Sequence, residues 1–199
     1  MARPIAFDRP KTVNRALALF WRKGYQAASL ADLLATMDIS RSSFYAAFID
    51  KRSLFIECLD LFSERTIELL QHARTQMPPV DALQNFFEHN FIGTGGTTAA
   101  KGHWGCMLVN TVLEMAGVDD ELSSRASRHL SIMPRVFQEY LQDAGAQPAQ
   151  AEELAAMLML MNEGIRVSSR RRLPDAQHLK PIATTFRLIR SAIALSNCT

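Results

Sequence analysis

The chain has 199 residues, of which 48% are hydrophobic, so an ordinary packed core is expected and wholesale disorder is excluded. A chain of this length forms one domain or two small ones. No apolar run approaches the roughly 20 residues that a membrane-spanning helix needs. Residues 1–12 carry charges and prolines where a secretory signal would have an apolar stretch, so we expect a soluble, cytoplasmic protein.

Three cysteines are present, Cys58, Cys106 and Cys198, widely spaced and without a CxxC pair. An odd number of scattered thiols is typical neither of a disulfide framework nor of a zinc cluster. The sequence also lacks a glycine-rich loop of the kind that cradles a phosphate. We therefore expect reduced thiols, no metal and no other cofactor.

The charge is divided unevenly along the chain. Residues 1–52 hold nine Lys or Arg against four acidic residues, a net charge of +5, whereas residues 53–199 hold 13 basic and 16 acidic residues, a net charge of −3. A basic head on a mildly acidic body suits a protein whose head meets a polyanion such as DNA. A chance scatter of surface charge is the alternative explanation.

Apolar residues recur at intervals of three and four along almost every segment, and no segment alternates convincingly as a half-buried strand would. This pattern predicts an all-α fold of about nine helices. Pro134 is expected to kink or break one of them, and Pro181 to lie in the first turn of the last. The expected helices span residues 10–23, 30–37, 41–48, 51–74, 80–91, 106–116, 119–144 and 148–168, and a final helix ends near residue 195.

Two short helices joined by a tight turn at residues 38–40 lie within residues 29–52. Ser29 is expected to cap the first, with Asp32 completing a capping box, and Ser40 to cap the second. Two short helices held at a fixed angle form a helix-turn-helix, whose second helix can enter a DNA major groove about 12 Å wide. The pattern therefore predicts a DNA-binding domain in the first 52 residues.

The second helix of this motif is expected to expose small and hydrogen-bonding side chains, because apolar residues such as Phe44 must pack inward. An arginine can bond guanine O6 and N7 or a phosphate, serines can bond either, and an alanine can touch a thymine methyl. A lysine at the start of the next helix, Lys51, adds a cation. The expected outer face consists of Arg41, Ser42, Ser43, Tyr45 and Ala46.

Along residues 10–62 the residue types follow a spacing that characterises a known family. The matching positions are Ser29, Leu33, Ile39, Ser40, Tyr45, Phe48, Lys51 and Leu54. This stretch resembles the DNA-binding domain of the TetR family of transcriptional regulators. Asp38 and Ser42 stand where that family usually has glycine, and an aspartate at residue 38 tolerates the left-handed turn conformation.

The resemblance implies that Tyr45 and Lys51 contact DNA phosphates, with Ser29 as a further contact. It places three polar residues nearest the bases, namely Arg41, Ser42 and Ser43. Packing in the core is the alternative for Tyr45 and Phe48. Because Phe44 already supplies an inward ring, we assign Tyr45 to a phosphate and Phe48 to the core.

The resemblance also implies a homodimer, paired through the last two helices as a four-helix bundle. One apolar stripe comprises Leu154, Met157, Leu158, Met161 and Ile165, and the other Ile182, Phe186, Ile189 and Ile193. Such stripes are equally typical of helices that face an internal core. We expect a DNA-binding domain at residues 1–52 and an effector-binding and dimerisation domain at residues 53–199, linked by the helix that starts at residue 51.

By the same resemblance the middle helices enclose a pocket for a small-molecule inducer. Ordinary core packing is the alternative for every side chain of its expected wall. The apolar bias of the wall points to a hydrophobic or aromatic effector. The wall candidates are Phe86, Phe87, Phe91, Trp104, Met107, Val112, Phe137 and Met161.

Cys106 lies at the expected N-terminus of a helix, with His103 three residues before it. A helix N-terminus and a nearby imidazolium both favour a reactive thiolate. The segment from Gly105 to Thr111 resembles the part of TetR-family members that senses electrophiles or oxidants through a cysteine. A small buried structural thiol is the alternative, so sensing by Cys106 and His103 is a hypothesis.

These features predict a sequence-specific DNA-binding transcriptional regulator. We expect a homodimeric repressor that a small molecule or thiol modification releases from a near-palindromic operator. One alternative is a cysteine-dependent enzyme using Cys106 and His103, and another is an effector-free architectural DNA-binding protein. Because no third orienting group stands at a recognisable spacing, we expect no enzymatic activity.

Overall fold

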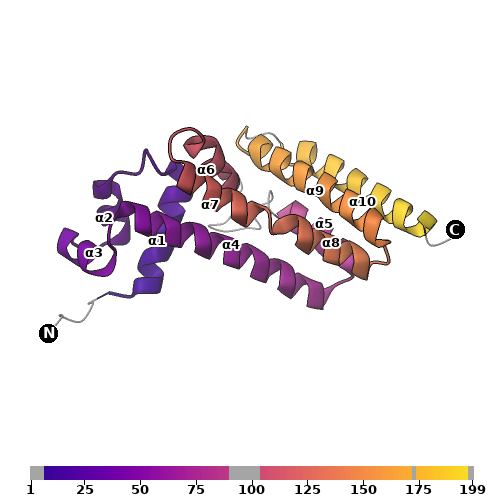
Figure 1. Cartoon of the computed structure of the whole chain (residues 1–199), viewed down its shortest axis with the longest axis horizontal. Helices are drawn as coiled ribbons and strands as arrows, with labels where there is room; N and C mark the ends of the chain where they lie inside the picture. Colours follow the sequence, from indigo (N-terminus) through magenta and orange to yellow (C-terminus); the bar gives the residue numbers. More distant parts are fainter. Residues whose placement is uncertain (1–6, 90–103, 172–173, 197–199) are drawn as a thin grey trace.

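The computed structural model describes residues 7–89, 104–171 and 174–196, and every regular element in these ranges is an α-helix (Figure 1). The all-α prediction is confirmed. The described residues form ten helices where about nine are expected, because the segment around Pro134 is broken in two. The helices are α1 (Arg9–Lys23), α2 (Leu30–Met37), α3 (Arg41–Ala47), α4 (Lys51–Gln76), α5 (Pro79–His89), α6 (Met107–Met115), α7 (Asp120–Leu130), α8 (Met133–Asp143), α9 (Pro148–Ser169) and α10 (Ala176–Ser196).

Side-chain caps begin each of the first four helices. Asp8 accepts a hydrogen bond from a backbone N–H of α1, and Asp50 does the same for α4. Ser29 and Asp32 form the expected capping box of α2, and the Ser40 hydroxyl accepts the Ser43 N–H of α3 at 3.1 Å. Because each such cap stabilises a helix by about 1 kcal/mol, the short helices α2 and α3 are fixed by their own sequence.

The residues that directly follow α1 and α2 both have a positive φ, a backbone conformation that favours glycine. Gly24 follows α1 with a φ of 83°, and Asp38 follows α2 with a φ of 59°. Asp38 is the one non-glycine residue of the described ranges that has a positive φ. The structure thus confirms that aspartate supports the turn conformation for which the family pattern has glycine.

Two prolines act differently in the second half of the chain. Pro134 lies in the first turn of α8, and Ser131 and Ile132 separate that helix from α7, so the expected break is confirmed. The expectation that Pro181 lies in the first turn of the last helix is wrong. Backbone hydrogen bonds to Pro174 and Asp175 begin α10 earlier, which leaves Pro181 inside the helix at the loss of one backbone hydrogen bond.

Figure 1 shows α1, α2 and α3 grouped as a head at one end, with α9 and α10 side by side in the body. The 26-residue helix α4, about 39 Å long, runs from the head into the body. Phe20 and Phe55 meet edge to face between α1 and α4, and Phe87 packs on Phe137 and Phe186 in the body. None of the described helices is long and apolar enough to span a bilayer.

The two apolar stripes of the last helices both face the interior, except at Met157. In α9 Leu158 is buried, and Leu154, Met161 and Ile165 pack against the core. The α10 stripe is buried inside the chain, as internal core, and it consists of Ile182, Phe186, Ile189 and Ile193. Other apolar side chains of α9 and α10 are open on the outer side of the same pair. These exposed residues are Met157, Leu160, Val167, Leu188 and Leu195.

Candidate nucleic-acid interface

The outer face of α3 is open to solvent. Arg41, Ser42 and Ala46 are exposed, and Tyr45 has 52% of its surface exposed. Phe44 on the opposite side of the helix is fully buried. This seven-residue helix therefore presents a thin, polar ridge on one side, while Phe44 on the other side packs into the core.

The serines of α3 form a local cluster with the cap. The hydroxyl of Ser40 lies 2.9 Å from the hydroxyls of both Ser42 and Ser43. Ser43 is half-buried, whereas Ser42 is exposed. Within this cluster Ser42 is thus the hydroxyl better placed to meet a groove, and Arg41 beside it takes part in no ion pair of the described residues.

Ser29 and Lys51 stand at the starts of the helices on either side of α3. The Ser29 hydroxyl is exposed and bonds the Asp32 carboxylate at 2.7 Å. The Lys51 ammonium lies 4.5 Å from the centre of the Tyr25 ring, a cation–π contact. Burial lowers the pKa of Lys51, and the nearby Glu114 charge opposes this shift. Helix starts also offer free backbone N–H groups, which suit a phosphate.

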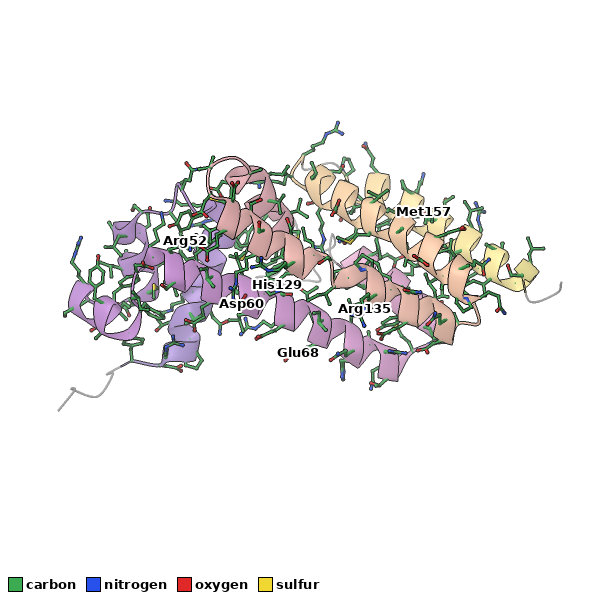
Figure 2. The ribbon with its side chains drawn as sticks, viewed as in Figure 1. Arg52, Asp60, Glu68, His129, Arg135 and Met157 are labelled. Atoms are coloured by element: carbon green, nitrogen blue, oxygen red, sulfur yellow. The ribbon has the colours of Figure 1, made fainter. Side chains whose placement is uncertain are left out.

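Ion pairs hold the head and α4 in place. Arg9 donates from both terminal nitrogens to the two Glu57 carboxylate oxygens at 2.6 and 2.8 Å, and Nη2 of Arg52 lies 2.9 and 3.1 Å from the two carboxylate oxygens of Asp119. The Asp119 hydrogen bond raises the pKa of Arg52, against a smaller effect of burial. Figure 2 shows Arg52 near the head end of α4. Because α4 begins directly after α3, the Arg52 contact ties the α3 end of the head to Asp119, which caps α7 of the body.

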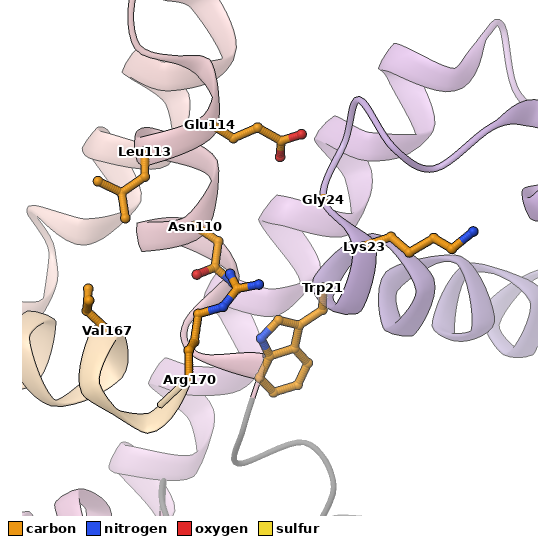
Figure 3. A pocket seen from close by; sticks show the side chains of 8 residues that line it. All are labelled: Trp21, Lys23, Gly24, Asn110, Leu113, Glu114, Val167 and Arg170. Carbon is orange, nitrogen blue, oxygen red and sulfur yellow. The ribbon is translucent and has the colours of Figure 1, made fainter. Parts of the chain in front are cut away.

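A second set of contacts joins the head to α6 (Figure 3). The indole N–H of Trp21 donates to the Gly105 carbonyl oxygen at 2.9 Å. The Glu114 carboxylate accepts the backbone N–H groups of Tyr25 and Gln26 at 2.9 and 2.8 Å. A surface pocket of about 330 Å³ lies between these contacts, and its wall includes Lys23, Asn110, Leu113, Val167 and Arg170.

The expected effector wall is dispersed through the body. Phe87 and Met107 are almost fully buried in the core, Met161 packs against that core, and Trp104 meets Trp21 edge to face at 5.6 Å. Phe91 and His103 lie outside the described residues. Among the described candidates for binding or sensing, only Phe86 and Cys106 line the narrow cavity between α4, α5, α6, α7, α8 and α9.

Sequence reasoning missed the polar side of that cavity, which Asn162 and Arg166 of α9 provide. Both are buried, with 5% and 7% of their surface exposed. A signal was available, because the buried face that starts at Ala151, Ala155 and Leu158 continues at helical spacing to residues 162 and 166. Polar residues at core positions of a helix indicate a site or a buried network.

An ion-paired network crosses from α4 to α7 beside this cavity. Asp60 accepts from Arg125 at 2.9 Å and lies 2.7 Å from His129 Nε2, and Figure 2 shows Asp60 and His129 together. Burial by itself would raise the pKa of Asp60, but the hydrogen bonds from Arg125 and His129 outweigh it and lower that pKa. In the described ranges no group of three or more His, Cys, Asp or Glu side chains is arranged to hold a metal ion.

Two family models match the chain. The one described as bacterial regulatory proteins of the tetR family matches residues 13–58. The one described as the C-terminal domain of LmrA/YxaF-like transcriptional regulators matches residues 79–185, which is more than half of the chain. The chain belongs to the TetR family. This TetR-family protein is a DNA-binding transcriptional regulator, and the family gives no support to the enzyme alternative.

Similar proteins match three quarters or more of this chain. The chain is similar to the HTH-type transcriptional repressor ComR of Escherichia coli, 25% identical over 192 residues that cover 94% of this chain and 90% of ComR. It is also similar to the repressor DhaR of a Mycobacterium, 25% identical over 155 residues that cover 76% and 74% of the two chains. A cysteine mutant of the TetR-family regulator CifR, solved with operator DNA, matches with a TM-score of 0.76 and 28% identity over 93% of this chain and 98% of that one.

Proposed function

We propose that this TetR-family regulator is a homodimeric repressor that leaves a near-palindromic operator when an effector binds its body or when Cys106 is modified. The observation that carries the proposal is the exposed outer face of α3, held on a head that is fixed to the body by Trp21 and Glu114. A head so fixed responds to changes in α6. The operator-bound structure of the similar protein CifR supports the DNA partner.

In this proposal residues 1–52 are the DNA-binding domain and residues 53–199 the effector and dimerisation domain. The exposed side chains of α3 that approach bases are Arg41, Ser42 and Ala46, with Ser43 beside them. Ser29, Tyr45 and Lys51 contact phosphates. The 52% exposure of Tyr45 supports this role, because a core tyrosine would be covered.

The dimer is proposed to form through the outer side of α9 and α10. Leu160, Leu188 and Leu195 are 72%, 61% and 70% exposed, and Met157, labelled in Figure 2, lies on the same helix pair. Large apolar side chains left open on two adjacent helices are typical of a partner interface. Pairing there would set the two copies of α3 about 34–36 Å apart, one turn of DNA.

The sensing role proposed for Cys106 rests on its place at the start of α6, where its side chain makes no capping hydrogen bond. Because only 6% of Cys106 is exposed, an electrophile has to enter the cavity to reach the thiol. Alkylation there would add volume directly after Gly105, whose carbonyl accepts the Trp21 indole. Modification of the thiol would thereby disturb the hydrogen bond that joins the head to the body.

Selection of bound sites from a random DNA pool tests the proposal. We expect the full chain to enrich one inverted repeat whose half-sites lie one helical turn apart, and to bind it with a steep dependence on salt. An electrophile that alkylates Cys106 should then release the selected DNA. Enrichment of no sequence, with equal binding to all members of the pool, would indicate an architectural protein instead.

A further inference from the structure

A buried guanidinium without an acidic partner lies in the body. Arg166 of α9 is only 7% exposed, and its Nε donates a long hydrogen bond of 3.4 Å to the Asn162 amide oxygen. Its guanidinium carbon lies 5.8 Å from the centre of the Phe86 ring. No described acidic side chain forms an ion pair with it. The remaining ranges, 1–6, 90–103, 172–173 and 197–199, contain no Asp or Glu.

Such a charge is costly to keep in the interior. A buried charge is tolerated when it is paired. An arginine stays protonated, so it cannot avoid the free-energy cost of desolvation by becoming neutral. Burial lowers the pKa of Arg166, because the low-dielectric surroundings disfavour the charged form. One long hydrogen bond, one ring contact and the electrostatic interaction with the Cys106 thiol are weak compensation. The chain thus maintains a positive site for which its own side chains supply no carboxylate.

Arg166 lines the narrow cavity between α4, α5, α6, α7, α8 and α9. The polar side of the cavity holds Arg166, Asn162 and Cys106, and α6 starts there without a side-chain cap. A helix N-terminus attracts negative charge, so this second feature points the same way as the guanidinium. The rest of the lining is mostly apolar and consists of Phe62, Phe86, Leu108, Leu130 and Met133, together with Ser63, Thr66 and His129.

We propose that the effector is an amphipathic carboxylate whose anionic group pairs with Arg166 while its apolar body packs against the aromatic and aliphatic wall. This inference rests on the proposed function, because it names the ligand class of the effector site. A planar guanidinium matches a carboxylate through two parallel hydrogen bonds. An apolar wall with a few convergent polar groups is the usual composition of a small-molecule site.

The small size of the cavity would connect binding of the effector to release of the operator, because the effector cannot enter without moving the helices. In this conformation the cavity holds about 20 Å³, room for about one water molecule, so a larger ligand must widen it. Gly105 packs closely on α9, because a Cβ added to it would lie 3.0 Å from the Arg166 carbonyl oxygen. A ligand that parts α6 from α9 at this point displaces the Gly105 carbonyl from Trp21. The widened state would then bind ligand better and operator worse, as induction requires.

Calorimetry on the full chain with matched probes tests the inference. The probes are benzoate, cinnamate and hexanoate, each compared with its primary amide, which has nearly the same shape and no charge. We expect at least one carboxylate to bind and to raise the Tm, and its amide to bind about 30-fold more weakly or worse. Equal binding of carboxylate and amide, or no binding by any of the three carboxylates, would overturn it.

The variant Arg166→Met removes the charge but keeps an unbranched apolar side chain. It should fold, with a Tm equal to or above that of the unaltered protein, because replacing an unpaired buried charge is neutral or stabilising. It should lose the preference for carboxylate over amide, whereas the exposed control Arg171→Met should keep it. An Arg166→Met protein that binds carboxylate unchanged would also overturn the inference.

The two proposals fail separately. Selective DNA binding is measured on the same preparations without any ligand. Selective DNA binding together with equal binding of carboxylates and amides would overturn the carboxylate inference alone. Carboxylate binding through Arg166 with no DNA selectivity would instead overturn the proposed repressor function.

Discussion

The indole N–H of Trp21 donates to the Gly105 carbonyl oxygen at 2.9 Å, so the last turn of α1 is bonded to the residue that precedes Cys106. Gly105 also packs on α9, where an added Cβ would lie 3.0 Å from the carbonyl oxygen of Arg166. One residue therefore contacts both the DNA-binding head and the helix that lines the cavity. In the proposed function, this contact couples the effector site to DNA binding.

Replacing Trp21 by phenylalanine removes this hydrogen bond but keeps an aromatic ring against Phe62 and Trp104. We expect the free energy of unfolding to fall by about 1 kcal/mol, the usual contribution of one such bond. Urea unfolding measures the loss. The exposed neighbour Arg22 provides the control, since Arg22→Ala should leave stability unchanged. Equal stability of Trp21→Phe and the unaltered protein would show that the junction bond contributes nothing.

We predict that alanine at Gly24 destabilises the protein, because Gly24 lies at the second contact between the head and α6, the one made by Glu114. The Gly24 φ of 83° disfavours a side chain, and an added Cβ would lie 2.6 Å from Oε2 of Glu114. Gly117, with a φ of 72° and open space around it, is a matched control for the backbone strain alone. Both substitutions by alanine should destabilise by about 1–3 kcal/mol. Gly24→Ala should cost more and weaken DNA binding, and equal effects on unfolding would contradict the packing at Glu114.

The Asp60 network gives stability a defined pH dependence. Because the folded pKa of Asp60 lies below its unfolded value near 4, its contribution is present above that value and is lost as the pH falls through the folded pKa. Asp60→Asn should remove this part of the acid dependence and cost about 1–2 kcal/mol at neutral pH, since Arg125 and His129 lose their partner. Unfolding measured across acid pH checks this, with the exposed Asp120→Asn as control. Parallel acid profiles for Asp60→Asn and the unaltered protein would refute the role of the network.

The proposed dimer face can be tested with two similarly exposed leucines. Leu160 on α9 is 72% exposed and Leu69 on α4 is 67% exposed, so a glutamate at either position is tolerated by a single chain. Leu160→Glu should yield monomers and weaken operator binding, whereas Leu69→Glu should leave the dimer intact. Sedimentation of both variants decides the matter. A dimeric Leu160→Glu protein would place the interface elsewhere.

Local signals made the head predictable from the sequence. The caps Ser29 and Ser40 and the turn at Asp38 depend on residues within a few positions, so their chemistry determines their conformation. The site in the body depends on which helix faces pack together, which is tertiary information. The sequence therefore did not predict a role for Arg166, although its place on the buried face of α9 follows from helical spacing once that face is known. The prediction that Pro181 lies in the first turn of the last helix was wrong because the turn at Pro174 and Asp175 starts α10 earlier.

In the proposed function, the outer face of α3 recognises base sequence. The most direct test compares Arg41→Ala and Lys51→Ala on the selected operator and on single-base-pair variants of it, over a range of salt concentrations. Arg41→Ala should lose about 1–3 kcal/mol on the operator and discriminate less at one position, whereas Lys51→Ala should weaken all sequences alike and lower the salt slope by about one. If Arg41→Ala kept the full sequence preference of the unaltered protein, α3 would not recognise bases through Arg41, which contradicts the account.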